Sequence, residues 1–164
     1  MDVNQEELEH LAARLGEALS RRNWRLAAAE SCTGGWAAQA MTAVAGSSDW
    51  FERGFVTYSN DAKQDLLEVS GRTLVEAGAV STETAREMAE GALRHSRAQC
   101  AFAITGIAGP GGGSADKPVG TVCFAWARVG ESTEIDRLRL AGDRRQVRAQ
   151  SVRHALSRML ALVT

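Results

Sequence analysis

Apolar residues recur at helical spacing in several stretches of the chain. Near the start, Asn4 stands three residues before Glu7, a pattern typical of a helix N-terminus. Leucine and alanine positions then repeat every three or four residues, which predicts an amphipathic helix over residues 5–22. The same reasoning predicts further helices over Trp36–Val44, from a cap at Asn60 or Asp61 to Leu67, from a cap at Ser81 through Leu93, and from a cap at Asp143 through Val163.

Short apolar runs between these helices predict strands. They cover Trp24–Ala29, Phe51–Tyr58, Cys100–Thr105, Thr121–Val129 and Thr133–Leu140, with the last two joined by a turn at Gly130-Glu131. The first run is rich in alanine, a weak strand former, so its assignment depends on its context before a turn. Strands that alternate with helices, plus one hairpin, predict an α/β fold, a three-layer α/β/α sandwich with a mixed, mostly parallel sheet. No repeat or linker divides the chain, so we expect one domain over residues 1–164.

The composition narrows the class of protein without specifying a chemistry. The 164 residues carry a net charge of −1 and 24% of them are charged, so nothing predicts binding to nucleic acid or to a membrane surface. Cys32, Cys100 and Cys123 form no CxxC pair, which argues against a zinc site or a disulfide framework and fits a reducing compartment. The sequence has no signal-peptide pattern and no apolar run near the roughly 18 residues of a membrane span. We therefore expect a soluble, cytoplasmic protein.

The first candidate site is the turn Ser31–Gly35, between a predicted strand and a predicted helix. Such a turn directs backbone N–H groups to one place at a helix N-terminus, and Gly34 and Gly35 leave room for a ligand close to the backbone. A phosphate or a developing oxyanion suits this environment. The alternative is a helix capped by Ser31 or Thr33, with the glycines required only by the turn.

The second candidate is Lys63, in the first turn of the short helix after Tyr58. The helix dipole disfavours a positive charge there, and partial burial would lower the pKa of the amine, as a general base requires. A solvated surface lysine is the alternative. Lys117, in the longer glycine-rich stretch Gly106–Gly120, has the same two interpretations.

The third candidate is the glycine-rich segment Thr105–Gly113, which follows a predicted strand and so lies on the same rim as Ser31. Closely spaced glycines can present backbone N–H groups to an anion. The spacing matches neither a P-loop nor a dinucleotide fingerprint, so the chain is not assigned to those classes. A disordered linker is the alternative to an ordered lid.

The last candidates are Arg144 and Arg148, four residues apart on one face of the final helix. Two guanidinium groups there could hold a phosphate, and surface ion pairs are the alternative. The three histidines lie on different helices without metal-ligand spacing. If Ser31 is a nucleophile, its base is therefore Lys63 rather than a histidine. Cys32 is a rival nucleophile, because a helix N-terminus favours a thiolate.

These motifs together resemble a known family. The residues are "AESCTGGW" at 29–36, "AGSSDWFERGFVTYSNDAK" at 45–63, "TGIAGPGGG" at 105–113, "KPVGTV" at 117–122 and "GDRRQVR" at 142–148. In this order they resemble the C-terminal domain of the competence/damage-inducible CinA family, in particular its stand-alone nicotinamide-nucleotide amidohydrolases. The resemblance implies hydrolysis of nicotinamide mononucleotide to nicotinate mononucleotide and ammonia in pyridine-nucleotide salvage. It also implies that the extra N-terminal domain of larger CinA proteins is absent here.

The resemblance further implies a serine–lysine mechanism, in which neutral Lys63 takes the proton of Ser31. Tyr58 matches a tyrosine that the family places close to this pair, where it would orient Lys63 or relay its proton. The expected substrate-binding residues are Thr33 and Gly34 or Thr105 and Gly106 for the oxyanion, Gly109 in the enclosing loop, and Arg144 or Arg148 for the phosphate. No metal or cofactor is expected. A homodimer is expected from the family and from the four tryptophans, and the alternative function is a non-catalytic nucleotide-binding module that acts through a protein partner.

Overall fold

A five-stranded sheet in the order β2-β1-β3-β4-β5 forms the centre of the molecule. The computed structural model describes residues 2–164. The strands are β1 (Leu26–Glu30), β2 (Phe51–Val56), β3 (Cys100–Gly106), β4 (Thr121–Arg128) and β5 (Glu134–Arg139). Pairing is parallel between β1 and its neighbours β2 and β3, and antiparallel from β3 to β4 and from β4 to β5. Only β4 therefore runs against the other four strands, and the predicted mixed sheet is confirmed.

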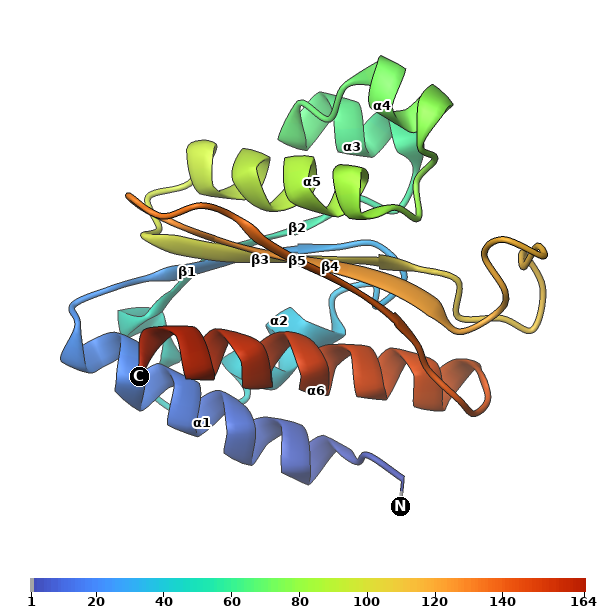
Figure 1. Cartoon of the computed structure of the whole chain (residues 1–164). Coiled ribbons are helices and arrows are strands. Elements are labelled where there is room, and N and C mark those ends of the chain that lie inside the picture. The colour runs from blue at the N-terminus through green and yellow to red at the C-terminus, as the bar shows by residue number, and fades with distance from the viewer. Residues whose placement is uncertain (1) are drawn as a thin grey trace.

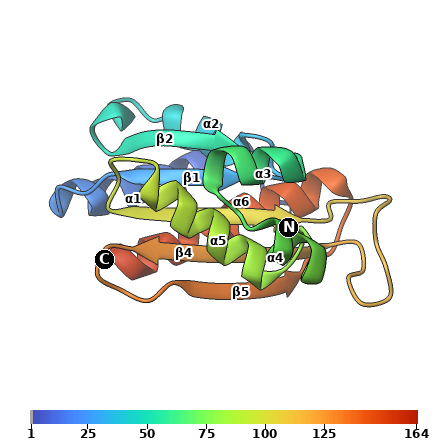
Figure 2. The ribbon, with the colours of Figure 1, turned by 90° about the horizontal axis from the view of Figure 1, so that it is seen from above.

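Helices cover both faces of this sheet, so the predicted three-layer sandwich is confirmed (Figure 1). One layer contains α1 (Gln5–Arg21), α2 (Trp36–Thr42) and α6 (Arg144–Val163), and the other contains α3 (Asn60–Leu67), α4 (Gly71–Glu76) and α5 (Thr82–Arg94). A short 3₁₀ helix, η1 (Ser47–Asp49), precedes β2. Seen from above, α5 runs along the middle of the sheet (Figure 2). None of the helices in residues 2–164 is long and apolar enough to span a membrane.

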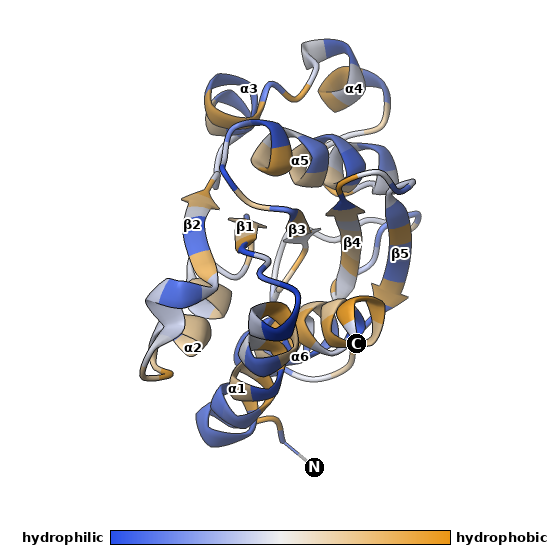
Figure 3. Ribbon diagram, turned by 90° about the vertical axis from the view of Figure 1, so that its left-hand side faces the viewer, coloured by the Kyte–Doolittle hydropathy of each residue, from blue (hydrophilic) through white to orange (hydrophobic). Residues whose placement is uncertain are grey.

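The two faces of the sheet carry side chains of different size. Successive residues of a strand point to opposite faces, and in β3 alanines alternate with Phe102 and Ile104. The large side chains form one core with α1, α2 and α6, whereas alanines form the second core under α5. Small side chains let α5 lie close to its neighbours, and a Cβ at Gly91 would be 2.0 Å from the carbonyl oxygen of Leu67. In Figure 3 hydrophilic residues dominate the outer turns of α1, away from these cores.

The helix starts test the predicted caps. Asn4, Ser81 and Asp143 each accept a hydrogen bond from the backbone N–H three residues on, as predicted. The cap of α3 was predicted wrongly, because Ser59, not Asn60 or Asp61, accepts the hydrogen bond from the N–H of Ala62, at 3.0 Å. Helix α4 was not predicted, and its six residues start without a side-chain cap.

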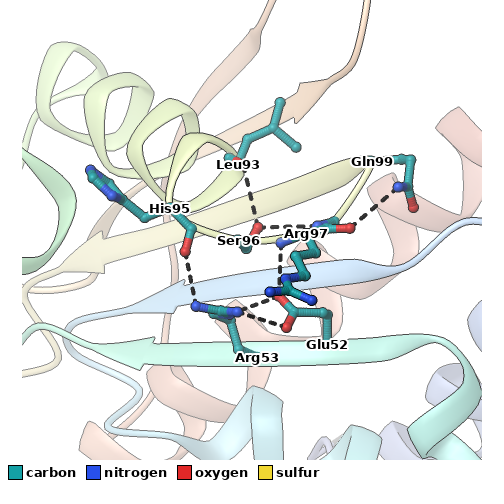
Figure 4. A network of polar contacts seen from close by, with 8 residues as sticks. Glu52, Arg53, Leu93, His95, Ser96, Arg97 and Gln99 are labelled. Carbon is teal, nitrogen blue, oxygen red and sulfur yellow. Dashed lines mark hydrogen bonds and ion pairs between the residues drawn. The ribbon is translucent and has the colours of Figure 1, made fainter.

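The amino ends of β1, β2 and β3 lie at one edge of the sheet, where polar side chains pair with each other (Figure 4). The guanidinium of Arg53 donates to both carboxylate oxygens of Glu52, at 2.7 and 2.9 Å, and to the carbonyl oxygen of His95, at 3.1 Å. Glu52 also accepts from the N–H of Arg97, at 3.0 Å. These groups tie β2 to the segment before β3, and the carboxyl ends of the three strands converge at the opposite edge.

Candidate active site

A cavity of about 280 Å³ lies at the carboxyl edge of the sheet. It is lined by Ser31 and Cys32 after β1, Tyr58 and Lys63 after β2, Ala79 and Val80 before α5, residues 105–109 with Gly111 and Gly112 after β3, and Arg144 of α6. A hollow of about 500 Å³ on α1 and α6 is larger. Its lining includes a hydroxyl, Ser157, and an imidazole, His10, but within residues 2–164 no hydrogen bond joins them as a nucleophile and its base. The candidate chemistry therefore lies at the sheet edge.

Ser31 and Lys63 contact each other at the floor of this cavity. The amine nitrogen Nζ of Lys63 lies 3.0 Å from the hydroxyl oxygen of Ser31, although 32 residues separate the two in the chain. The same nitrogen lies 2.9 Å from the carbonyl oxygen of Thr57 and 3.2 Å from that of Tyr58. Lys63 is only 1% exposed and Ser31 only 8%. The structure thus brings together the two residues that the sequence nominated as nucleophile and base.

The surroundings of Lys63 favour a neutral amine. Burial lowers the pKa of Lys63 below its ordinary value, and no carboxylate in residues 2–164 forms an ion pair with it. A neutral amine has two N–H donors and one lone pair. When the amine is neutral, the carbonyl oxygens of Thr57 and Tyr58 can accept from its two N–H groups, and its lone pair is then available to the hydroxyl proton of Ser31. The role of Lys63 as the base for Ser31 stays a prediction.

Local structure explains how Lys63 reaches the cavity. The N-cap Ser59 starts α3 directly after β2, so Lys63 falls in the first turn of a helix that begins at the carboxyl edge of the sheet. The backbone N–H of Lys63 donates to the carbonyl oxygen of Ser59, at 3.1 Å. Its side chain then turns inward rather than to solvent, and the alternative of a solvated surface lysine is excluded for Lys63.

The turn Ser31–Gly35 is held by groups on both sides. The N–H of Ser31 donates to the carbonyl oxygen of Ile104 at 2.9 Å, which ties the turn to β3. Gly35, the N-cap of α2, has a φ of 102° and no side chain with which to cap the helix. The buried carboxylate of Glu30 does so instead, accepting from the N–H groups of Ala37 and Ala38 at 2.8 and 3.0 Å. Sequence reasoning missed this role of Glu30, although an acidic residue before a helix that lacks a capping side chain was a usable signal.

Arg144 and Arg148 share a helix face but contact different parts of the site. Arg144 lines the cavity and donates to the carbonyl oxygen of Gly109, at 2.8 Å. Arg148 does not line the cavity, and its guanidinium donates to the carbonyl oxygens of Cys32 and Thr33 at 3.0 and 3.1 Å. Both arginines line a neighbouring hollow of about 490 Å³ beside Trp36, but only Arg144 also lines the cavity that holds Ser31. A phosphate-binding role for either stays a prediction.

Tyr58 contacts the pair through its backbone. Its carbonyl oxygen accepts from Lys63 and lies 3.5 Å from the hydroxyl of Ser31. Tyr58 is 62% exposed, and its phenol oxygen accepts a hydrogen bond from Arg144 at 3.3 Å. A role of the phenol in proton transfer stays a prediction.

The remaining predicted residues lie around the turn and the glycine-rich segment. Thr105 lines the cavity, and its hydroxyl donates to the carbonyl oxygen of Ala79 at 2.8 Å. A Cβ at Gly106 would lie 2.8 Å from a methyl group of Val122, so only glycine fits between the two strands there. Thr33 is fully buried, and the N–H of Gly34 donates to the carbonyl oxygen of Ser31 at 3.0 Å. The Gly34 N–H is therefore not free for an oxyanion in this structure.

Cys32 does not have the properties of a nucleophile. Burial raises the pKa of its thiol to about 12, against the opposing charge of Arg148, so the expectation of a favoured thiolate was wrong. None of the histidines lines the cavity, and among residues 2–164 no group of three or more His, Cys, Asp or Glu side chains could hold a metal ion.

Comparisons with known proteins find related sequences and a related structure. The family model described as CinA C-terminal domain matches residues 8–163. The nicotinamide-nucleotide amidohydrolase PncC of Escherichia coli strain K12 is 51% identical over 150 residues, which cover 92% of this chain and 91% of that protein. A CinA-like protein of Syntrophobacter fumaroxidans is 50% identical over 95% of this chain and 37% of its own length. The crystal structure of a competence/damage inducible protein, CihA, from Agrobacterium tumefaciens superposes with a TM-score of 0.94 at 45% identity, covering 100% of this chain and 99% of that one.

Proposed function

The chain belongs to the CinA C-terminal domain family, and from that premise we propose that it hydrolyses nicotinamide mononucleotide to nicotinate mononucleotide and ammonia. Ser31 is the nucleophile and Lys63 the base of this reaction. The observation that carries the proposal is the 3.0 Å contact between the amine of a buried lysine and the hydroxyl of Ser31. Its 51% identity to an amidohydrolase over most of both chains supports the same reaction class.

The first half of the reaction transfers the acyl group to the enzyme. The hydroxyl oxygen of Ser31 attacks the carboxamide carbon while neutral Lys63 takes the hydroxyl proton, which leaves a tetrahedral oxyanion. The ammonium of Lys63 then returns this proton to the amide nitrogen. The C–N bond breaks, ammonia departs, and a nicotinoyl ester remains on Ser31.

The second half releases the product through the same pair. A water molecule attacks the ester carbon while Lys63, neutral again, takes its proton. The ester bond between the acyl carbon and the Ser31 oxygen breaks, Lys63 reprotonates that oxygen, and nicotinate mononucleotide leaves. Two side chains thus supply both the nucleophile and the proton transfers, so no step requires a cofactor.

The walls of the cavity suit the parts of this substrate. Ala79 and Val80 offer an apolar surface to the pyridine ring, and the glycine-rich segment offers backbone to the ribose. Arg144, the guanidinium that lines the cavity, is the proposed partner of the phosphate. Residues 1–164 act as one domain in this proposal.

Ammonia release from nicotinamide mononucleotide tests the proposal. We expect release by the wild-type protein in the presence of a metal chelator, and none above background from folded Ser31→Ala. The matched control is Cys32→Ala, which removes the neighbouring thiol and keeps the turn. We expect Cys32→Ala to retain activity within about 3-fold, because its thiol is protonated at neutral pH.

The same experiment separates the alternative functions. Loss of activity in Cys32→Ala together with survival in Ser31→Ala would assign the reaction to a cysteine hydrolase. A wild-type protein that binds the nucleotide tightly and releases no ammonia would instead be a non-catalytic binding module.

The homodimer also stays a prediction. Two of the four tryptophans that motivated it, Trp50 and Trp126, are buried in the core of the chain. Sedimentation velocity at micromolar concentration tests the prediction, and a monomer contradicts it.

A further inference from the structure

Two successive backbone N–H groups directly after Ser31 have no acceptor. Within residues 2–164, the N–H groups of Cys32 and Thr33 donate to no other residue, whereas those of Ser31 and Gly34 each donate to a carbonyl oxygen. Cys32 is 7% exposed and Thr33 is fully buried. Buried N–H groups without an acceptor are rare in folded proteins, because each costs about 1–3 kcal/mol of desolvation. Their position beside the nucleophile points to an acceptor that arrives with the substrate.

The carbonyl oxygens of the three residues 31–33 all accept hydrogen bonds. The oxygen of Ser31 accepts from the N–H of Gly34, at 3.0 Å. The oxygen of Cys32 accepts from Nε of Arg148 at 3.0 Å, and that of Thr33 accepts from Nη2 of the same guanidinium at 3.1 Å. Arg148 therefore holds two successive peptide units of the turn with one rigid fork.

The hydrogen bond from Arg148 to the Cys32 carbonyl oxygen sets the direction of the Thr33 N–H group. Cys32 C=O and Thr33 N–H belong to one peptide unit, which is planar and trans, so the two bonds point in opposite directions. Arg148 reaches the Cys32 oxygen from α6 and does not line the cavity, so the Thr33 N–H is directed away from α6. Cys32, which shares this peptide unit with Thr33, lines the cavity next to Ser31, whereas the Thr33 side chain does not.

We propose that the N–H groups of Cys32 and Thr33 form the oxyanion hole of the reaction, and that Arg148 is the positioning residue that orients it. The inference rests on the proposed function, since the oxyanion is the one formed when Ser31 attacks an amide carbon. Arg148 does not contact the substrate in this scheme. It acts through the peptide units that it holds, and oriented donors of this kind contribute most where water is excluded.

The surroundings of Arg148 suit this role. No carboxylate in residues 2–164 pairs with its guanidinium, which instead lies 5.4 Å from the centre of the Trp36 ring, so its positive charge acts on the turn without a partner that neutralises it. A positive charge at the carbonyl oxygen polarises the peptide unit and makes its N–H a stronger donor. Glu30 fixes the far end of the turn through Ala37 and Ala38, so the strand, the turn and α6 form one rigid frame.

Steady-state kinetics with nicotinamide mononucleotide separate positioning from substrate binding. For Arg148→Met we expect kcat to fall about 10²-fold with KM nearly unchanged, as for the loss of an oxyanion-hole donor. Arg148→Lys should not restore kcat, because one ammonium cannot span two carbonyl oxygens as the guanidinium does. Arg153→Met is the matched control, an exposed arginine on the same helix that pairs with Glu7. A KM increase with kcat preserved, or rescue by lysine, would make Arg148 a phosphate ligand and overturn the inference.

A second measurement does not depend on the substrate. Diisopropyl fluorophosphate phosphorylates activated serines: the Ser31 oxygen bonds to phosphorus, fluoride leaves, and Lys63 takes the hydroxyl proton. Negative charge develops on the phosphoryl oxygen, so the oxyanion hole accelerates this step too. We expect intact-mass labelling of the wild type and of Arg153→Met at equal rates, and labelling of Arg148→Lys about 10²-fold slower. Thermal unfolding checks that each variant is folded.

The two measurements fail in different ways. Labelled wild-type protein that releases no ammonia contradicts the proposed function, and the labelling rates of the variants then decide the inference alone. Equal labelling rates for the wild type and folded Arg148→Lys overturn the inference, whatever the ammonia assay gives. A wild-type Ser31 that is not labelled at all overturns it as well, because no competent oxyanion hole is then present.

Discussion

Two loops meet at the carboxyl edge of the sheet and line the same cavity, but they are held very differently. Residues 31–33 of the turn after β1 are buried, their carbonyl oxygens all accept hydrogen bonds, and Glu30 and Arg148 fix the turn from opposite sides. The glycine-rich loop after β3 projects beyond the sheet (Figures 1 and 2), and residues 110–116 are exposed. Its contacts to other elements gather at its ends, where Arg144 holds Gly109 and Arg137 holds the carbonyl oxygen of Asp116, at 2.7 Å.

This difference matches two mechanical demands on one site. A displacement of about 1 Å of a nucleophile or its oxyanion donors reduces activity strongly. The turn meets this demand because several hydrogen bonds fix its position. A loop that covers a substrate must admit it first, and glycines without side chains leave the backbone free to approach the ligand. Changes in the turn should therefore alter kcat, whereas changes in the loop should alter KM.

The largest effect is expected from Lys63→Met on the rigid side of the site. The variant keeps a long side chain but loses the amine next to Ser31, and we expect kcat to fall about 10³-fold. For the wild type, kcat/KM should rise with pH through the lowered pKa of Lys63. A wild-type profile without a limb below pH 10.5, or a Lys63→Met variant that keeps full activity, would contradict the role of the amine.

The same substitution should change stability with a defined sign. Burial lowers the pKa of folded Lys63 below the ordinary 10.5, so between that lowered pKa and 10.5 the unfolded chain binds more protons. The free energy of unfolding of the wild type therefore rises with pH across this window. Lys63→Met lacks this dependence, so its stability advantage should be greatest below the lowered pKa and shrink towards pH 10.5. Urea unfolding of both proteins at several pH values measures it.

Gly109→Ala should distort the glycine-rich loop, the less restrained of the two loops. Gly109 has a φ of +83°, and an added Cβ would lie 2.5 Å from a methyl carbon of Val119, so the loop must shift. We expect KM to rise about 10-fold, equivalent to about 1.4 kcal/mol of lost binding, with kcat less affected. Gly46→Ala is the matched control, since its φ is +82° and no atom lies within 4 Å of the added carbon. Both variants should lose about 1 kcal/mol of stability, but an altered KM in Gly46→Ala would refute the loop explanation.

Thr105→Val tests a cavity residue near the end of β3, just before the glycine-rich loop. Its hydroxyl donates to the carbonyl oxygen of Ala79 from a position that is 1% exposed. Removing the donor should cost about 1–2 kcal/mol of stability and raise KM about 3-fold, because the apolar wall at Ala79 loosens. Ser151→Ala removes a buried hydroxyl within α6 and should leave KM unchanged. Equal kinetic effects of the two substitutions would assign Thr105 to stability alone.

The smallest effect is expected from Lys117→Met. The amine of Lys117 donates to the carbonyl oxygen of Ala77 at 2.6 Å, but the side chain is only half-buried. We expect less than about 1 kcal/mol of destabilisation and a KM within about 2-fold of the wild type. A loss of kcat comparable to that of Lys63→Met would show that the loop lysine takes part in the chemistry.

The two lysines also show what the sequence could predict. From local sequence both were either solvated or functional, and only the packed structure buries Lys63 against the carbonyl oxygens of Thr57 and Tyr58. Helix caps such as Ser81 and Asp143 were predictable because the capping bond spans three residues. The absence of a suitably placed histidine already favoured Lys63 as the base of Ser31, and the family resemblance implied the same pair, but no local pattern contains their contact.

The features of the site that could not be predicted from the sequence are the contacts made by the terminal groups of long side chains. A spacing of four residues correctly placed Arg144 and Arg148 on one face of a helix. It could not show that one guanidinium reaches Gly109 and the other reaches Cys32 and Thr33, since both side chains extend well beyond the helix surface. Tyr58 likewise lay in the right motif, but its phenol contacts Arg144 while its carbonyl contacts Lys63.

The first turns of α6 carry a constraint on how the gene can change. One helix presents Arg144 to the loop and Arg148 to the turn, so a one-residue insertion between them rotates one guanidinium about 100° relative to the other. No substitution elsewhere in the chain restores the angle between the two side chains around the helix axis. Insertions and deletions should therefore accumulate in the exposed part of the glycine-rich loop and at the β4–β5 turn, and be absent from residues 144–148 of functional relatives. An alignment of functional relatives would therefore show the coupling of Arg144 to Arg148 in the positions of insertions and deletions rather than in residue identities.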